Sequence, residues 1–454
     1  MSKILHRDLK TTPIIIESSS GNYLYAKHPT NPDTPQQQLF DAIGGAAVIS
    51  VGHNNDEVNQ AVIDQLQKVA YIHSGTFTTS ISEELATELL ENYKSEKLAK
   101  VYFANSGSEA NEAAIKLVMQ YWYESGKGAK CHFISRKQSY HGNCLGGMSL
   151  SGHVARRKPY ESLIDSSKFH HVSPCFEFRY KKSGQSSAEY VEGLLDELEE
   201  EILEIGPENV AAFFAETVVG ATTGCVTAAK GYFKGVREIC DKYDILLVLD
   251  EVMCGSGRTG TFFAWEQEGI VPDITTCGKA ISSGASPLSC VVLTEKVLKG
   301  LTNGSNQFNC GHTYQSFALS CAAGKAVQKI VKRDGLLQNV TDVGEYLGQQ
   351  LHDKVLSVFD IVIDVRGRGL FWAIEFGKSK TTNEPFDESD NVASKITDIC
   401  MNHGVSIYPC KGTVDGFKGD HVIIAPSFTV TKQDIDLIVD AVVKSIQEFI
   451  DIVA

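Results

Sequence analysis

The 454-residue sequence lacks several features that would assign it to a specialised class of protein. Its 12 cysteines are scattered and form no C-x-x-C pair, which argues against a zinc ribbon, a thioredoxin-type motif and a small disulfide scaffold. No apolar run reaches 18 residues, and the N-terminal stretch has no apolar segment typical of a secretory signal. No internal repeat is visible. We therefore expect neither a membrane-spanning nor a secreted protein.

The chain also lacks an excess of basic residues. Its 42 lysines and arginines are outnumbered by 56 aspartates and glutamates, so the sequence predicts no affinity for nucleic acid or anionic membranes. Free cysteines used as small apolar residues are typical of a reducing compartment. A cytoplasmic location is expected, although Lys3, Arg7 and Lys10 give a faint basic bias that leaves a mitochondrial one open.

Strands and helices alternate in the middle of the chain. Continuously apolar segments, expected to be strands buried on both faces, occur at Val101–Ala104, Cys131–Ser135, Ala211–Glu216 and Ile245–Glu251. Helical periods separate them. Apolar strands separated by helices predict an α/β fold with a mostly parallel, doubly wound sheet.

The two ends of the chain follow a different pattern. Helices are predicted at Glu57–Val69 and Thr431–Ile450, and the segment Phe359–Phe376 is typical of two antiparallel strands. We expect a large central domain over residues 70–325. A smaller α+β domain would be assembled from residues 1–69 and 326–454.

Polar residues follow two of the predicted strands at the edge where open α/β sheets bind ligands. Ser106, Gly107 and Ser108 lie between the first strand and a helix. Free amides at that helix N-terminus could bind a phosphate, or Ser108 could simply cap the helix. Tyr140 and His141 lie beyond the second strand, where the tyrosine could stack on a planar ligand or pack under a loop.

Carboxylates end the other two strands. Asp250 follows five apolar residues, and a buried carboxylate is costly unless a cation pairs with it. No lysine or arginine is near in sequence, so the fold or a ligand such as a protonated heterocyclic nitrogen must supply the cation. Glu216 raises the same question, and two such acids could also bind a divalent metal. Val252 could pack against a ring.

Lys279 stands among small residues in "DITTCGKAISSG", far enough after Asp250 for a helix and a further strand. It is either a solvated lysine with small neighbours or a desolvated one, whose lowered pKa would make it a nucleophile near neutral pH. A nucleophilic lysine, a phosphate site, a stacking aromatic ring and a buried carboxylate are together the parts needed to bind pyridoxal 5′-phosphate (PLP).

With these parts in place, the sequence resembles the class III aminotransferases, which are PLP-dependent enzymes of fold type I. The resemblance covers nearly the whole chain and follows the order of the family's motifs. Six motifs carry it: "SGSEANE" (106–112), "YHG" (140–142), "AETVVG" (215–220), "DEVMCGSGRTG" (250–260), "CGKAISSG" (277–284) and "HTYQ" (312–315).

The resemblance implies a role for each candidate residue. Lys279 would bind the cofactor covalently and move a proton, and Asp250 would keep the pyridine nitrogen protonated. The other implied cofactor-binding residues are Gly107 and Ser108 for the phosphate, Tyr140 and Val252 for the faces of the ring, His141 and Glu216 at the strand ends, and Thr313 for the phosphate of the neighbouring subunit. No metal is implied.

The implied activity is transfer of an amino group from an amine or amino acid, of the ω-amine type, to a keto acid such as pyruvate by a ping-pong mechanism. A homodimer with active sites at the interface is implied as well. The alternatives are a racemase or aminomutase of the same fold and a cofactor-binding protein without turnover. A nucleotide-dependent oxidoreductase is a further alternative, but the first strand is not followed by G-x-G-x-x-G.

The sequence departs from the family in the residues that bind a substrate carboxylate. Where other branches carry a paired glutamate and arginine, this chain has Ala221 and Ile423. Ala46 and Ala47 stand where bulky residues are frequent, which predicts a roomier pocket. Cys277 precedes the lysine motif where serine or alanine is common. A substrate carboxylate would need another cation, and the candidates are Arg258, Arg366, Arg368, Lys411 and Lys418.

Overall fold

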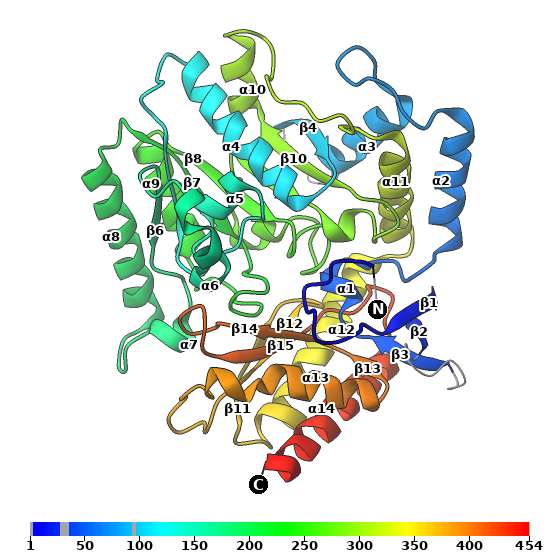
Figure 1. The fold of residues 1–454 in the computed structure, drawn as a ribbon. Helices are drawn as coiled ribbons and strands as arrows, with labels where there is room; N and C mark the ends of the chain where they lie inside the picture. The colour runs from blue at the N-terminus through cyan, green and yellow to red at the C-terminus, as the bar shows by residue number, and fades with distance from the viewer. Residues whose placement is uncertain (1–2, 28–35, 93–96, 454) are drawn as a thin grey trace.

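The computed structural model describes residues 3–27, 36–92 and 97–453, and its central feature is a seven-stranded sheet (Figure 1). In spatial order the strands are β4 (Leu98–Ala104), β10 (Ser289–Thr294), β9 (Ile274–Cys277), β8 (Leu246–Glu251), β7 (Val210–Glu216), β5 (His132–Arg136) and β6 (Phe169–Val172). Strand β10 is antiparallel to both neighbours, and the remaining neighbouring pairs are parallel. The sheet is mostly parallel, as the apolar segments predict.

Helices cover both faces of this sheet. One apolar core contains side chains of α3 (Ser80–Glu91), α8 (Ser187–Ile205) and α9 (Tyr232–Lys242), and the other contains side chains of α4 (Gly107–Glu124) and α10 (Glu295–Thr302). Phe213 lies in the first core, and its neighbour Phe214 lies in the second. Because successive side chains of a strand point to opposite faces, burial on both faces requires an unbroken apolar run.

Residues from both ends of the chain form the lower part of the molecule in Figure 1. An antiparallel sheet contains β11 (Val362–Gly367), β12 (Trp372–Phe376), β15 (Asp420–Ile424) and β14 (Tyr408–Lys411). A second sheet contains β1 (Ile15–Ser20), β2 (Tyr23–Lys27), β3 (Gln37–Asp41) and β13 (Val405–Ser406). Because β13 pairs with β3, the two ends of the chain share a sheet.

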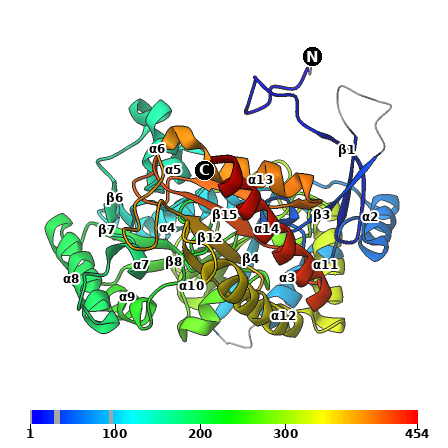
Figure 2. The same cartoon turned by 90° about the horizontal axis from the view of Figure 1, so that it is seen from below.

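Helices α12 (Leu336–Leu351), α13 (Val392–Asn402) and α14 (Lys432–Val453) complete the core of this lower part and lie nearest the viewer in Figure 2. Helix α11 (Ala318–Arg333) packs against α3, α12 and α2 (Asp56–Lys68), and the predicted domain boundary after residue 325 falls within it. The domain boundaries therefore stay a prediction. No helix in the described ranges is long and apolar enough to cross a membrane.

The predicted elements are confirmed with shifted ends, but several strands were not predicted, among them β6 and β10 of the large sheet. The four apolar segments lie in β4, β5, β7 and β8, and Phe359–Phe376 contains the antiparallel pair β11 and β12. Strand β10 follows β9 after the short segment 278–288 instead of a helical crossover. A short connection permits only an antiparallel neighbour, which is why β10 breaks the parallel pattern.

The buried side chain of Arg258 connects the large sheet to the lower part of the molecule by hydrogen bonds. Its side chain is fully buried, and its guanidinium donates to the carbonyl oxygens of Leu370 (3.2 Å), Pro426 and Ile49 (2.9 Å). The guanidinium carbon lies 4.6 Å from the centre of the Phe428 ring. Burial lowers the pKa of Arg258 to about 9. The group therefore joins segments from both ends of the chain to the loop after β8.

Arg258→Met should lower the free energy of unfolding by about 3 kcal/mol, because it leaves three buried carbonyl groups without donors. Denaturant unfolding measures the change. Arg333→Met is the matched control, since this exposed arginine is paired with Glu57 and Asp334 at the surface and its replacement should leave the free energy of unfolding nearly unchanged. Equal losses for the two variants would contradict the structural role of Arg258.

Candidate active site

The predicted site residues lie at the carboxyl ends of the strands of the large sheet. Glu216 ends β7, Asp250 is the register partner of both Glu216 and Thr276, and Lys279 follows β9. Tyr140 lies in the segment after β5. Parallel strands end at the same edge of a sheet, so the fold brings these residues together where α/β proteins bind ligands.

Asp250 is buried and surrounded by neutral hydrogen-bond donors and one histidine. Its Oδ2 accepts from Asn111 Nδ2 (2.7 Å) and contacts His141 Nδ1 (2.9 Å), and its Oδ1 accepts from the Val252 amide (3.0 Å). The Thr276 hydroxyl lies 3.4 Å from Oδ1. No lysine or arginine forms a salt bridge with Asp250 within the described residues. The fold therefore orients this carboxylate without neutralising it by a cationic lysine or arginine.

Glu216 positions the segment that carries Tyr140. Its Oε1 accepts from the Tyr140 amide (3.0 Å), and its Oε2 accepts from the Gly220 amide (2.8 Å). Burial raises the pKa of Glu216, and the nearby charge of Asp250 raises it further. The Glu216 side chain therefore ties the loop after β5 to the end of β7.

The N-terminus of α4 leaves two amides free. Ser106 caps the helix by accepting from the Glu109 amide (3.2 Å), while the amides of Gly107 and Ser108 have no hydrogen-bond partner in the part of the chain that is described. The Ser108 hydroxyl accepts from the Asn143 amide (2.9 Å). An 18-residue helix with free N-terminal amides is suited to bind an anion such as a phosphate.

The start of α4 packs directly against the loop after β8. A Cβ atom at Gly107 would lie 2.5 Å from Val252 Cγ1, and one at Gly278 would lie 3.3 Å from the same atom. Any larger residue at position 107 would displace Val252. Glycine is therefore required where the backbone approaches this side chain, which is available to pack against a flat ring.

Lys279 has a strained backbone and an unpartnered amine. Its φ angle is +47°, in the left-handed region that residues other than glycine rarely adopt, and such strain is typical of functional sites. Its Nζ makes no hydrogen bond to any described residue, and Lys279 is absent from their ion pairs. Burial lowers the pKa of Lys279, although the charges of Asp250 and Glu216 oppose the shift. The amine is thus poised to act as a base or nucleophile.

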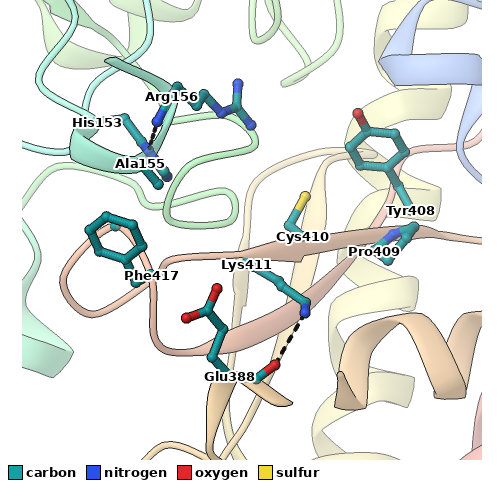
Figure 3. A pocket seen from close by; sticks show the side chains of 10 residues that line it. His153, Ala155, Arg156, Glu388, Tyr408, Pro409, Cys410, Lys411 and Phe417 are labelled. Atoms are coloured by element: carbon teal, nitrogen blue, oxygen red, sulfur yellow. Dashed lines mark hydrogen bonds between the residues drawn. The ribbon is translucent and has the colours of Figure 1, made fainter. Parts of the chain in front are cut away.

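A cavity of about 300 Å³ is lined by residues from two parts of the chain, and Arg156 connects it to Tyr140, which is not itself a lining residue. Arg156, in helix α6 (Val154–Arg157), lines it, and its guanidinium carbon lies 4.7 Å from the centre of the Tyr140 ring. Tyr408, Cys410 and Lys411 of β14 lie across from it (Figure 3). Burial raises the pKa of Tyr140, while the charge of Arg156 lowers it.

Thr313 is the one predicted site residue that lies apart from this cluster. It is exposed in the segment between α10 and α11, and its neighbour Tyr314 packs against Tyr71 and Phe317. No described contact joins Thr313 to Lys279 or Asp250. Its assignment depends on a second subunit and stays a prediction.

Three of the five candidate cations for a substrate carboxylate already have acceptors within the fold, which argues against them. Arg258 is sealed among carbonyl groups, as described above. Arg366 pairs with Asp364 and Glu375 (both 2.6 Å), and Arg368 pairs with Glu268 (2.9 Å). Lys411 lines the cavity but donates to Asn391 Oδ1 and, at 3.4 Å, to the Glu388 carbonyl group, and Lys418 is exposed.

Sequence reasoning missed three residues of the site. Asn111 lies one turn after Gly107 and therefore faces the same side of α4, and it lies within a motif that was identified. The Thr276 hydroxyl donates to Asn111 Oδ1 (2.8 Å), and its position opposite Asp250 depends on the register of two distant strands. Arg156 lies outside all six motifs, so the sequence contained no signal for it.

The comparisons with known proteins agree with this geometry. The family model described as aminotransferase class-III matches residues 4–446. An uncharacterized aminotransferase of Schizosaccharomyces pombe is 44% identical over 96% of this chain and 92% of its own length. Gamma aminobutyrate transaminase 3 of Solanum lycopersicum is 34% identical over 93% of this chain and 78% of its own length.

Solved structures agree as well. An amine transaminase from an uncultivated Pseudomonas species, described in its PLP-bound form, superposes with a TM-score of 0.90 at 28% identity and covers 98% of both chains. The residues present here fit PLP on two observations. The amides of Gly107 and Ser108 at the N-terminus of α4 have no partner among the described residues and can bind its phosphate, and the buried carboxylate of Asp250 has no lysine or arginine partner there and can pair with a protonated ring nitrogen.

Lys279→Met should stabilise the protein when PLP is absent, by about 1 kcal/mol near pH 7, because it removes a charge from a buried site. The pKa of Lys279 is lower in the folded state than the ordinary 10.5, so the folded state binds fewer protons between the two values and the charge penalty disappears as the pH rises through them. The gain should therefore fall to zero above about pH 10.5. Thermal unfolding from pH 7 upward measures it.

Lys127→Met serves as the control for this series, because Lys127 is an exposed lysine paired with Asp244. It should give no stabilisation at any pH. A gain for Lys279→Met that did not change with pH would show that the lysine side chain, and not its buried charge, is responsible.

Proposed function

Because the chain belongs to the class III aminotransferases, which use PLP, we propose that it transfers an amino group from an ω-amine or ω-amino acid to a keto acid such as pyruvate by a ping-pong mechanism. The observation that carries the proposal is the state of Lys279. Its amine is buried and unpartnered, its backbone is strained, and it follows the strand next to that of Asp250.

The residues around Lys279 are assigned as follows. The amides of Gly107 and Ser108 would bind the phosphate of PLP, Val252 and Tyr140 would pack against its ring, and Asp250 would hold the proton on its pyridine nitrogen. His141 and Asn111 orient Asp250, and Glu216 orients Tyr140. Thr313 contributes from the partner subunit of a homodimer.

Bound PLP supplies an electron sink for the electron pair that remains on a substrate carbon when its proton is removed. The protein moves that proton. A lysine with a lowered pKa is neutral over a wider pH range, so Lys279 can accept the proton and return it to a neighbouring atom. Because the Asp250 carboxylate is held in one orientation, its stabilising charge is already in place and needs no rearrangement during the reaction.

Three relatives support an ω-amine donor. They are named gamma aminobutyrate transaminase, vanillin aminotransferase and amine transaminase, and none of these names denotes an α-amino acid donor. The apolar residues Ala221 and Ile423 favour the same class, because they form an apolar wall and do not bind an α-carboxylate.

Lys279→Ala should lower turnover at least about 1,000-fold, because it removes both the nucleophile and the base. Reduction of the PLP-loaded enzyme with borohydride should attach the cofactor to Lys279, which peptide mass spectrometry can detect. The control is Lys127→Ala, which should keep full activity and the label. Retention of turnover by Lys279→Ala would disprove the mechanism.

Asn111→Ala should weaken PLP binding about 10- to 100-fold, because Asp250 loses its shortest hydrogen bond and its fixed orientation. Absorbance titration of the protein with PLP measures the dissociation constant. Asn209→Ala is the control, since Asn209 immediately precedes β7 at the opposite end of the sheet. Equal dissociation constants for wild type and Asn111→Ala would show that Asn111 does not position Asp250.

A further inference from the structure

The cavity beside Tyr140 contains an arginine that no acid neutralises. The Arg156 guanidinium lies over the Tyr140 ring at 4.7 Å and extends into the cavity toward the side of Tyr408 (Figure 3). It forms no ion pair or hydrogen bond with any described residue. A guanidinium at a cavity wall with all its donors available is suited to bind a carboxylate through two parallel hydrogen bonds.

The other arginines do not share this property. Within the described ranges only Arg7, on the exposed N-terminal segment, is similarly unpaired. The arginines that donate to side-chain or backbone acceptors are Arg136, Arg157, Arg179, Arg237, Arg258, Arg333, Arg366 and Arg368. The charge of Arg7 also lowers the pKa of Tyr140, but Arg156 is the unpaired arginine that lines the cavity.

The neighbours of Arg156 do not cancel its charge. His153 is neutral at physiological pH, because burial and the charge of Arg156 lower its pKa to about 4. Cys410 is buried and lines the same cavity as Arg156, and burial raises the pKa of its thiol, while the positive charges of Arg156 and Lys279 lower it. Glu388 also lines the cavity, but Figure 3 shows its carboxylate on the side of Phe417 and Lys411.

The position of Arg156 favours substrates whose carboxylate is distant from the reacting amine. The guanidinium lies on the ring of Tyr140, so a substrate that presents its amine to Lys279 must extend past that ring to reach it. In an α-amino acid one carbon separates the amine from the carboxylate, whereas the chain of an ω-amino acid can extend past the ring of Tyr140. Ala221 and Ile423 offer no competing cation, since both belong to an apolar cluster with Cys410 and Tyr408.

We propose that Arg156 is a specificity-determining residue that binds the distal carboxylate of an ω-amino acid whose amine reacts at Lys279. This inference rests on the proposed function, because Tyr140 and Lys279 must border the reacting amine. The substrate class is an unbranched acid with several carbons between the amine and the carboxylate, such as 4-aminobutanoate. The step is one of binding only, and no bond forms or breaks at Arg156.

The test compares 4-aminobutanoate with its neutral isostere 4-aminobutanamide. The PLP-loaded enzyme is mixed with each amine without a keto acid, and the loss of the cofactor's visible absorbance gives the rate of the first half-reaction. Arg156→Gln should lower kcat/KM for 4-aminobutanoate about 10- to 100-fold and change that for the amide less than about 3-fold. Arg156→Lys should recover part of the loss.

Two matched variants act as controls. Arg157→Gln changes the adjacent arginine, which contacts His171 instead of the cavity, and it should leave both rates unchanged. Lys411→Gln tests the other cation of the cavity and should lower the rate for 4-aminobutanoate less than about 3-fold. A selective loss for Lys411→Gln without one for Arg156→Gln would overturn the proposal, as would equal losses for the acid and the amide.

A binding measurement separates this proposal from the proposed function. Calorimetric titration of the PLP-loaded enzyme with pentanoate and pentanamide reports on carboxylate binding without turnover. Wild type should bind pentanoate at least about 10-fold more tightly than pentanamide, and Arg156→Gln should remove the difference. If wild type turns over no amine but shows this preference, the transferase proposal fails while the carboxylate site stands. Equal binding by wild type would overturn the site itself.

Discussion

The site depends on a carboxylate held inside the protein without a lysine or arginine. Burial of Asp250 at the end of β8 is tolerable because Asn111, His141 and the Val252 amide lie within 3.0 Å of its oxygens. These donors come from α4, from the segment after β5 and from the loop after β8. Four neighbouring elements, including β9 through Thr276, must therefore keep their relative positions for the carboxylate to remain oriented.

Lys279 is the second ionisable group that the strand ends bury in the site. The same strand ends that bury Asp250 also desolvate the amine, and the charges of Asp250 and Glu216 partly oppose the resulting fall in its pKa. The small residues around Lys279 allow the chain to turn sharply between β9 and the antiparallel strand β10. A strained lysine between two buried strands is a costly arrangement, and it is stable here because both strands belong to the large core.

The arginines divide into structural and available groups. Arg258 and Arg366 are surrounded by acceptors within the fold, and Arg258 joins both ends of the chain to the large sheet. Arg156 belongs to the available group, since it stacks on an aromatic ring and has no acid partner among the described residues. The fold thus uses most guanidinium groups for cohesion and leaves one at the wall of the cavity.

The sequence by itself determined which residues reach the edge of the sheet. Unbroken apolar runs identify buried strands locally, and polar residues directly after them must lie at strand ends, so Asp250, Glu216, Tyr140 and Lys279 could be found without a structure. The tertiary structure decided which of their neighbours touch. Asn111 and His141 meet Asp250 only through the order of the strands and the packing of α4, and the direction of β10 follows from a short connection. The sequence also could not predict the partner of each arginine. An ion pair such as that of Arg368 with Glu268 joins residues far apart in the chain and depends on how the two parts of the molecule pack.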